Sequence, residues 1–252
     1  ISTHPMTSER MSDMQNRTRH MSPVTHRDSM DFFLVKARAR VLQETTYDGW
    51  LKVSKSFENE LKRHPAGYSL VATQYGLSVA YAKMNQKDKA LTAIRAAKAA
   101  SKENSVILDK HLAELTYQVA KTQAQKDQAL ALAKSTCNQY PYSGLAASNY
   151  VELLFQSGKH QELVNYLRNQ SALSRSNPDY HMYLARSYEA LGKKSMAFAA
   201  TGDMYALLDN PRAAVYQFEL AQKANDGDFY IMSEIDAKLR EQRQKVLDQK
   251  KD

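Results

Sequence analysis

Apolar residues recur every three or four positions along most of this chain, and short polar turns divide the pattern into segments of helical length. Leu154, Leu163 and Leu167 form one such apolar seam. A turn at Ser157-Gly158 interrupts it, and a turn at Leu191-Gly192 interrupts the next pair of segments. Residues at this spacing share one face of an α-helix. The pattern therefore predicts pairs of antiparallel amphipathic helices.

The helical pairs repeat with a constant period. Aligned on their apolar positions, successive units begin at Lys110, Gly144 and Pro178, and each start lies 34 residues after the one before it. A 34-residue unit of two helices is the tetratricopeptide repeat (TPR). A single helical hairpin buries only part of its apolar surface, so several hairpins must stack. We therefore expect an all-α, TPR-type helical-hairpin superhelix, or α-solenoid.

An earlier stretch fits the same pattern well. Position 11 of a TPR unit is aromatic, positions 20 and 27 are small, and position 24 is large and apolar. Counted from Val71, these positions hold Tyr81, Ala90, Ala97 and Ile94. Small residues at fixed positions allow two helices to approach closely, because each faces a large side chain.

Two further units are less regular. A weak one begins near Leu34, and its second helix is expected within Trp50–Arg63. Another register overlaps the unit from Pro178, because Gly202 occupies its small position 8 and Phe218 its large position 24. We expect one helix to be shared between these overlapping units.

The two ends of the chain differ from the repeats. Residues 1–28 are rich in Ser, Thr, Met, Arg and His, so we expect a linker there, with a helix over Ser8–His20. The chain begins with isoleucine rather than methionine, from which we expect a preceding portion. The solenoid is expected over residues 29–252. Residues 225–228 (Asn-Asp-Gly-Asp) break its pattern, and a highly charged helix at residues 229–251 is expected to cap it.

Composition narrows the possibilities further. Of 252 residues, 43% are hydrophobic and 25% charged, as in folded proteins, while 8 Gly and 6 Pro are too few for many strand-connecting turns. Cys137 is the single cysteine, which excludes an intrachain disulfide and a multi-cysteine zinc site. No apolar run approaches the length of a membrane span, so we expect no membrane insertion. The net charge of +8 arises from basic residues interleaved with acidic ones, and we expect no nucleic-acid binding.

Both ends of the chain resemble a known family. The stretches concerned are Thr3–Arg10 (THPMTSER), Asp31–Arg38 (DFFLVKAR), Gly202–Leu207 (GDMYAL), Ala213–Gln222 (AAVYQFELAQ) and Ile235–Arg240 (IDAKLR). The first two are similar to the passage that joins the peptidase to the TPR domain in periplasmic M48 metalloproteases, and the others to the end of those proteins. The resemblance implies that the chain is such a C-terminal TPR domain, with the tail of the preceding peptidase domain in residues 1–28.

The sequence lacks the chemistry of that family's catalytic domain. An M48 protease needs His-Glu-x-x-His, which places two zinc-binding imidazoles one helical turn apart. No such motif occurs, and no two of the seven histidines are spaced four residues apart; they are His4, His20, His26, His64, His111, His160 and His181. We therefore expect no catalytic residue, metal ligand or cofactor here, with zinc bound only by a peptidase domain outside this sequence.

Candidate binding residues follow from the repeat register. First-helix positions 2, 5, 9 and 12 of a TPR unit usually line the concave wall of the superhelix. The candidates at these positions are Ala82, Gln118, Lys121, Glu152, Phe155, Met182, Arg186 and Glu189. Their mixed polarity predicts moderate, polar recognition without one hydrophobic anchor. For any single one of them, a solvated helix face is an equally good interpretation.

These patterns favour a non-catalytic protein–protein interaction domain, because a stacked solenoid presents an extended groove to a peptide or helix. The resemblance implies a periplasmic scaffold that recruits substrates for its protease in outer-membrane protein assembly and quality control. Its implied partners are the barrel-assembly machinery and nascent outer-membrane proteins. Two alternatives remain open: a self-associating TPR module, and an M48-type peptidase activity in this chain.

Overall fold

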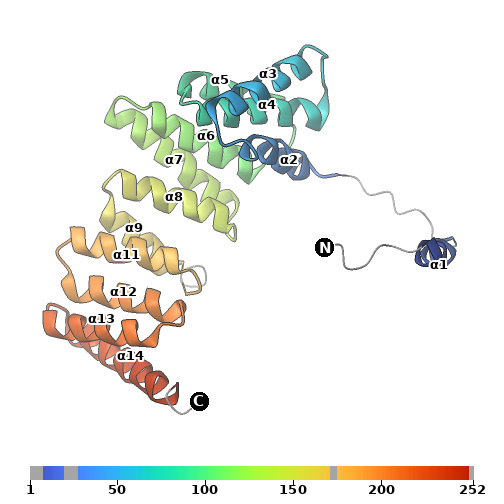
Figure 1. The fold of residues 1–252 in the computed structure, drawn as a ribbon. Helices are drawn as coiled ribbons and strands as arrows, with labels where there is room; N and C mark the ends of the chain where they lie inside the picture. The colour runs from blue at the N-terminus through green and yellow to red at the C-terminus, as the bar shows by residue number, and fades with distance from the viewer. Residues whose placement is uncertain (1–7, 20–27, 171–174, 250–252) are drawn as a thin grey trace.

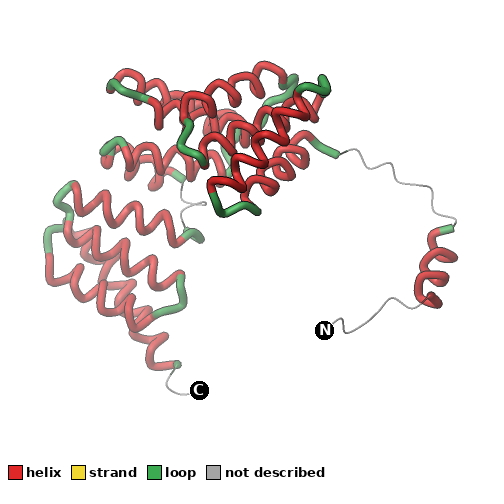
Figure 2. The backbone as a smooth tube through the Cα atoms, turned by 45° about the horizontal axis from the view of Figure 1, so that its top comes forward, coloured by secondary structure: helices red, strands yellow, loops and turns green. Residues whose placement is uncertain are grey.

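The computed structural model describes residues 8–19, 28–170 and 175–249. Every regular element in those ranges is an α-helix, and Figure 2 shows the helices joined by loops. The all-α fold expected from the sequence is therefore confirmed. The expected linker over residues 1–28 falls largely outside the described residues, as does the end of the expected capping helix. Both boundaries stay predictions.

Within the described ranges, six helical hairpins follow one short N-terminal helix. The helices are α1 (Ser8–Thr18), α2 (Met30–Leu42), α3 (Tyr47–Leu61), α4 (Gly67–Lys83), α5 (Lys87–Ala100), α6 (Val106–Val119), α7 (Gln123–Gln139), α8 (Gly144–Gln156), α9 (His160–Asn169), α11 (Pro178–Ala190), α12 (Lys194–Leu207), α13 (Pro211–Ala224) and α14 (Phe229–Asp248). Figure 1 shows α2 to α14 stacked in chain order into a curved superhelix, with α1 standing apart from the stack. The architecture is that of a TPR-type α-solenoid.

Four inter-helix turns share one backbone geometry. Asn85, Gly158, Gly192 and Asp209 each lie two residues beyond a helix and have positive φ, between 53° and 74°. In each turn, the carbonyl of the residue at repeat position 11 accepts a hydrogen bond from the backbone N–H of the residue five positions later. These four carbonyls belong to Tyr81, Leu154, Tyr188 and Tyr205. The bonds satisfy carbonyls that a helix end otherwise leaves unpaired.

The fourth of these turns joins α12 to α13, which are the helices of the overlapping unit. A Cβ added to Gly202 would lie 2.8 Å from the ring of Phe218, so the two backbones approach as closely as a glycine permits. Both residues are buried. The small-against-large contact expected from positions 8 and 24 is therefore present, and α12 is shared between two hairpins.

The buried apolar side chains form three successive clusters rather than one centre. The first joins α2 to α6, the second joins α6 to α12, and the third lies between α12, α13 and α14. In the third, α14 buries Ile235 and Leu239 and exposes its charged face, as a capping helix should. Each hairpin thus depends mainly on its neighbours for burial, which is the organisation of a repeat protein.

Candidate functional site

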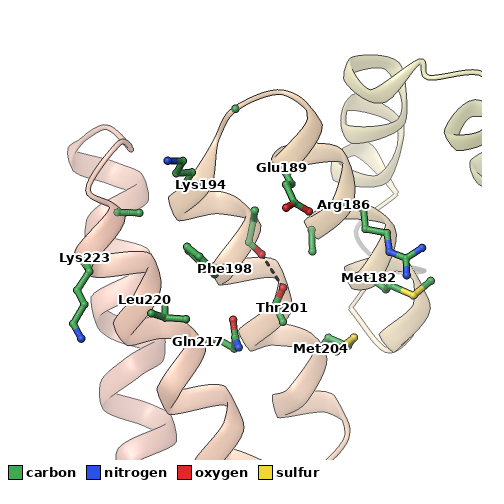
Figure 3. A pocket seen from close by; sticks show the side chains of 14 residues that line it. Met182, Arg186, Glu189, Lys194, Phe198, Thr201, Met204, Gln217, Leu220 and Lys223 are labelled. Atoms are coloured by element: carbon green, nitrogen blue, oxygen red, sulfur yellow. Dashed lines mark hydrogen bonds between the residues drawn. The ribbon is translucent and has the colours of Figure 1, made fainter.

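The stack is hollowed along one face near its C-terminal end. A groove of about 700 Å³ lies between α11 and α13, and α12 forms its floor (Figure 3). Its lining residues are Met182, Ala185, Arg186, Glu189, Gly192, Lys194, Ala197, Phe198, Thr201, Met204, Gln217, Leu220, Lys223 and Ala224. We refer to it below as the α11–α13 groove.

Helical periodicity accounts for the two walls of this groove. Met182, Arg186 and Glu189 are spaced four and three residues apart on α11, so they project from one face. On α13, Leu220 and Ala224 occupy one face in the same way. Parallel first helices of adjacent hairpins are separated by the second helix between them, so their facing side chains leave a hollow above that helix.

The floor on α12 is mostly apolar. Phe198 and Met204 are half-buried, with part of each side chain accessible from the groove. Thr201 adds a hydroxyl, but that hydroxyl donates to the carbonyl of Ala197 at 3.0 Å (Figure 3). The floor therefore offers incoming groups apolar contact and little hydrogen bonding.

Charged side chains surround the floor. Arg186, Lys194, Lys223 and Glu189 are all exposed, and none of the four makes an ion pair within the described part of the chain. The first backbone N–H groups of α12 face the same end, but the carboxylate of Asp226 accepts two of them, from Lys194 and Ser195, each at 2.7 Å. The positive charge of the rim therefore resides in flexible side chains, not in a free helix N-terminus.

Three of the eight residues expected on the concave wall line this groove: Met182, Arg186 and Glu189. Gln118 and Glu152 are exposed on α6 and α8, away from the groove. Two others are partly enclosed by the stack. Ala82 packs against the first apolar cluster, and the ring of Phe155 contacts the rings of Tyr183 and His160 at centroid distances of 5.3 and 5.5 Å.

The eighth residue, Lys121, does not lie on a first helix at all. The repeat register placed it at position 12, but α6 ends at Val119 and Lys121 belongs to the loop before α7. The reason is a capping box in which the Thr122 side chain and Gln125 satisfy each other's backbone N–H groups. Because of this capping box, α7 begins at Gln123. Within its repeat unit, this start is three residues earlier than the starts of α5, α9 and α12 within theirs.

The sequence reasoning missed the opposite wall and the floor. One more 34-residue step from Pro178 begins a unit at Arg212, which puts Leu220 at position 9 and Lys223 at position 12. The rule that positions 2, 5, 9 and 12 of a first helix line the concave wall would have found both. It does not cover second helices, so nothing in it points to Phe198 or Met204. With these residues included, the groove is more apolar than the eight candidate positions indicate, and the expectation of polar recognition without a hydrophobic anchor stays a prediction.

A buried polar cluster elsewhere has the residue types of a hydrolytic triad. The Ser78 hydroxyl lies 3.0 Å from Nε2 of His111, and Nδ1 of His111 lies 3.7 Å from a carboxylate oxygen of Glu114. The Ser78 hydroxyl, however, donates to the carbonyl of Ala90 at 2.7 Å, so its oxygen accepts from the His111 N–H. Ser78 is fully buried. A substrate has no access to it, and the cluster ties α4, α5 and α6 together.

The ionisation of this cluster follows from its burial. Burial lowers the pKa of His111, although Glu114 acts in the opposite direction. Burial would raise the pKa of Glu114, but His111 and Lys110 together bring it below its usual value. A neutral imidazole beside a charged carboxylate is the expected state near neutral pH.

The zinc ion implied by the family resemblance finds no ligand set here. No group of three or more His, Cys, Asp or Glu side chains within the described ranges is arranged to hold a metal ion. The sulfur of Cys137 is buried instead, at 3.5 Å from the hydroxyl of Tyr166, and burial raises the pKa of its thiol. Among the helices of the described residues, none combines the length and apolarity that a membrane crossing requires.

Comparison with known proteins shows a distant sequence similarity to curated proteins. No family model matches the chain. It is 24% identical over 213 residues to the beta-barrel assembly-enhancing proteases of Escherichia coli K12 and of Shigella flexneri. The alignment covers 81% of this chain and 40% of each relative. The chain therefore spans well under half the length of these relatives.

Among the solved structures that are similar to this chain, three are each 12% identical to it. A tetratricopeptide repeat protein from Parabacteroides merdae has a TM-score of 0.48, with 93% of this chain and 90% of that chain covered. YrrB, described as a TPR protein with an unusual peptide-binding site, has a TM-score of 0.40 (90% and 97% covered). The APC/C hetero-tetramer Cut9–Hcn1 has a TM-score of 0.49 (92% and 45% covered). These scores lie below 0.5, so the likenesses say nothing of what this chain binds.

Proposed function

We propose that this chain is a non-catalytic module that binds a segment of a protein partner in the α11–α13 groove. The observation that carries the proposal is the groove itself. Protein interiors are close-packed, and apolar side chains such as Phe198 and Leu220 are normally covered in a stacked repeat. Here they line an open hollow of about 700 Å³, a size suited to several side chains of a bound segment.

We further propose the biological setting of this module. The similarity of its ends to periplasmic M48 metalloproteases and its 24% identity to beta-barrel assembly-enhancing proteases support a periplasmic location. In that setting the module would act as a scaffold that recruits substrates to its protease during outer-membrane protein assembly and quality control. The proposed partners are the barrel-assembly machinery and nascent outer-membrane proteins.

Site-specific photo-crosslinking in the native cell envelope tests this proposal. A photo-reactive amino acid would be placed at Leu220, inside the groove, and separately at Tyr142, which is 94% exposed in the loop between α7 and α8. We expect adducts with a barrel-assembly subunit or a nascent outer-membrane protein from Leu220 and not from Tyr142. Equal adducts from both positions, or none from Leu220, would contradict the proposal.

A second variant separates binding from folding. Met204→Gln makes the floor polar at a half-buried position with little change of volume. With the photo-reactive group at Arg186, on the rim, we expect Met204→Gln to reduce adduct formation. The circular dichroism spectrum and melting temperature of the variant must match those of the parent, so that the loss reports the groove and not unfolding.

A further inference from the structure

The two ends of the α11–α13 groove differ in chemistry. The end of α11, the start of α12 and the end of α13 meet at one end, and Glu189, Lys194 and Lys223 lie there. Met182 near the start of α11 and Met204 near the end of α12 lie toward the other end (Figure 3). A bound segment would therefore meet charge at one end and thioether side chains at the other.

The three cations that line the groove are not held by carboxylates, as some other cations of the stack are. Lys159 pairs with Asp127, and Lys238 with Asp203, each at 2.8 Å. Arg186, Lys194 and Lys223 make no ion pair in the described part of the chain. Two carboxylates are near, those of Glu189 and Asp226, and the second is already bound by the N–H groups of Lys194 and Ser195. Neutral N–H groups leave the charge of Asp226 in place, so Arg186, Lys194 and Lys223 together exceed the two carboxylates by one positive charge.

The other end is built for apolar side chains. Met204 and Met182 are flexible and polarisable, so they adapt to side chains of different shape. Phe198 and Leu220 extend this surface toward the middle of the groove. An apolar residue placed here loses no hydrogen bond, whereas a charged one would be desolvated without a partner.

These observations, which rest on the proposed function of the groove, specify its occupant. We infer that the α11–α13 groove takes a polypeptide segment whose apolar side chains contact Met204 and Leu220 and whose carboxylates meet Lys194 and Lys223. Charge complementarity favours an acidic segment over a neutral or basic one, because opposite charges steer association and like charges oppose it.

Fluorescence anisotropy with two matched peptides tests the inference. Both carry a dye and the same Leu and Phe residues, and they differ only in having Glu or Lys at the flanking positions. With the whole chain at low salt, we expect the Glu peptide to bind about ten-fold more tightly than the Lys peptide. Raising the ionic strength should reduce this difference, because both lysines are exposed.

Charge-reversed variants locate the effect. Lys194→Glu with Lys223→Glu should abolish or reverse the preference for the Glu peptide. Lys52→Glu with Lys55→Glu is the matched control, since it changes the net charge equally at two exposed lysines of α3, far along the stack. The control should keep the preference of the parent.

The possible failures are distinguishable. Equal affinity for both peptides, or a preference unaffected by Lys194→Glu and Lys223→Glu, would overturn the acidic occupant while leaving binding in the groove intact. Binding that Leu220→Gln and Met204→Gln leave unchanged would overturn the groove as the binding site, and with it the proposed function. If neither peptide binds at any salt concentration, both proposals fail.

Discussion

Asp226 caps a helix that begins 32 residues before it. Its carboxylate accepts the backbone N–H of Ser195 at 2.7 Å, and the Ser195 hydroxyl oxygen in turn accepts the backbone N–H of Asp226 at 3.2 Å. The residue that precedes α12, Lys193, provides no side-chain cap of its own. The loop between α13 and α14 thus supplies the cap of α12 and fixes the floor of the α11–α13 groove against its α13 wall.

Removing this cap should destabilise the fold. We expect Asp226→Ala to lower the free energy of unfolding by about 0.5–2 kcal/mol, the usual range for a lost N-cap. Urea denaturation measures the loss, and a double-mutant cycle with Ser195→Ala should give a coupling energy above zero because the two residues bond reciprocally. Additive effects of the two changes would show that the contact contributes nothing.

The same contact has a defined pH dependence. Hydrogen bonds from Ser195, from its side chain and its backbone, lower the pKa of Asp226 below its usual value. Its stabilisation is therefore present above the unfolded pKa of 3.8 and lost as the pH falls through the lower folded value. Asp226→Asn is the matched control, since an amide oxygen still accepts a backbone N–H but does not titrate in this range.

This cap marks one limit of what the sequence could predict. The sequence predicts that residues 225–228 break the repeat, and they do, but the partner of Asp226 depends on how α13 returns beside α12. Short-range signals were more informative. The contact between Gly202 and Phe218 follows directly from the repeat register, because small and large residues must alternate where helices touch. The capping box at Thr122 could also have been recognised from its spacing, and it would have prevented the wrong placement of Lys121.

The close approach of α12 and α13 makes Gly202 intolerant of a side chain. A Cβ there would lie 2.8 Å from the buried ring of Phe218, so Gly202→Ala should lower the free energy of unfolding by about 1–3 kcal/mol despite the higher helix propensity of alanine. Gly144→Ala, at the start of α8, is the control, because no atom lies within 4 Å of the added Cβ. It should be neutral or stabilise by up to about 1 kcal/mol. Thermal unfolding of both variants tests the contrast, and equal effects would refute the contact.

The buried cluster around His111 should make stability fall in mild acid. Burial lowers the pKa of His111 below 6.5, so between that folded value and 6.5 the unfolded chain binds more protons than the folded one. Stability should therefore decrease as the pH drops from about 7.5 to about 5.5, the range in which a free imidazole titrates. Glu114, Lys110 and Arg38 also act on the pKa of this imidazole.

His111→Gln tests that assignment. An amide side chain can still donate a hydrogen bond to Ser78, but it carries no titratable proton. We expect the variant to be less stable than the parent at neutral pH and to lose less stability on acidification. Urea denaturation at each pH measures both effects. The control is His64→Gln, which replaces an exposed histidine in the loop after α3. A slope that His111→Gln does not alter would place the titrating group elsewhere.

The likeness of Ser78, His111 and Glu114 to a hydrolytic triad leads to the last prediction. Nucleophilic catalysis needs a hydroxyl that a substrate carbonyl can reach, and Ser78 is fully buried with its proton donated to the Ala90 carbonyl. We expect no peptide hydrolysis by this chain, with or without added zinc, in an assay with quenched fluorescent peptides. Ser78→Ala should leave that baseline unchanged while lowering the melting temperature, because it leaves the His111 N–H without its acceptor. Turnover that Ser78→Ala removes would establish a serine hydrolase, and turnover that a chelator removes would establish a metallopeptidase in this chain.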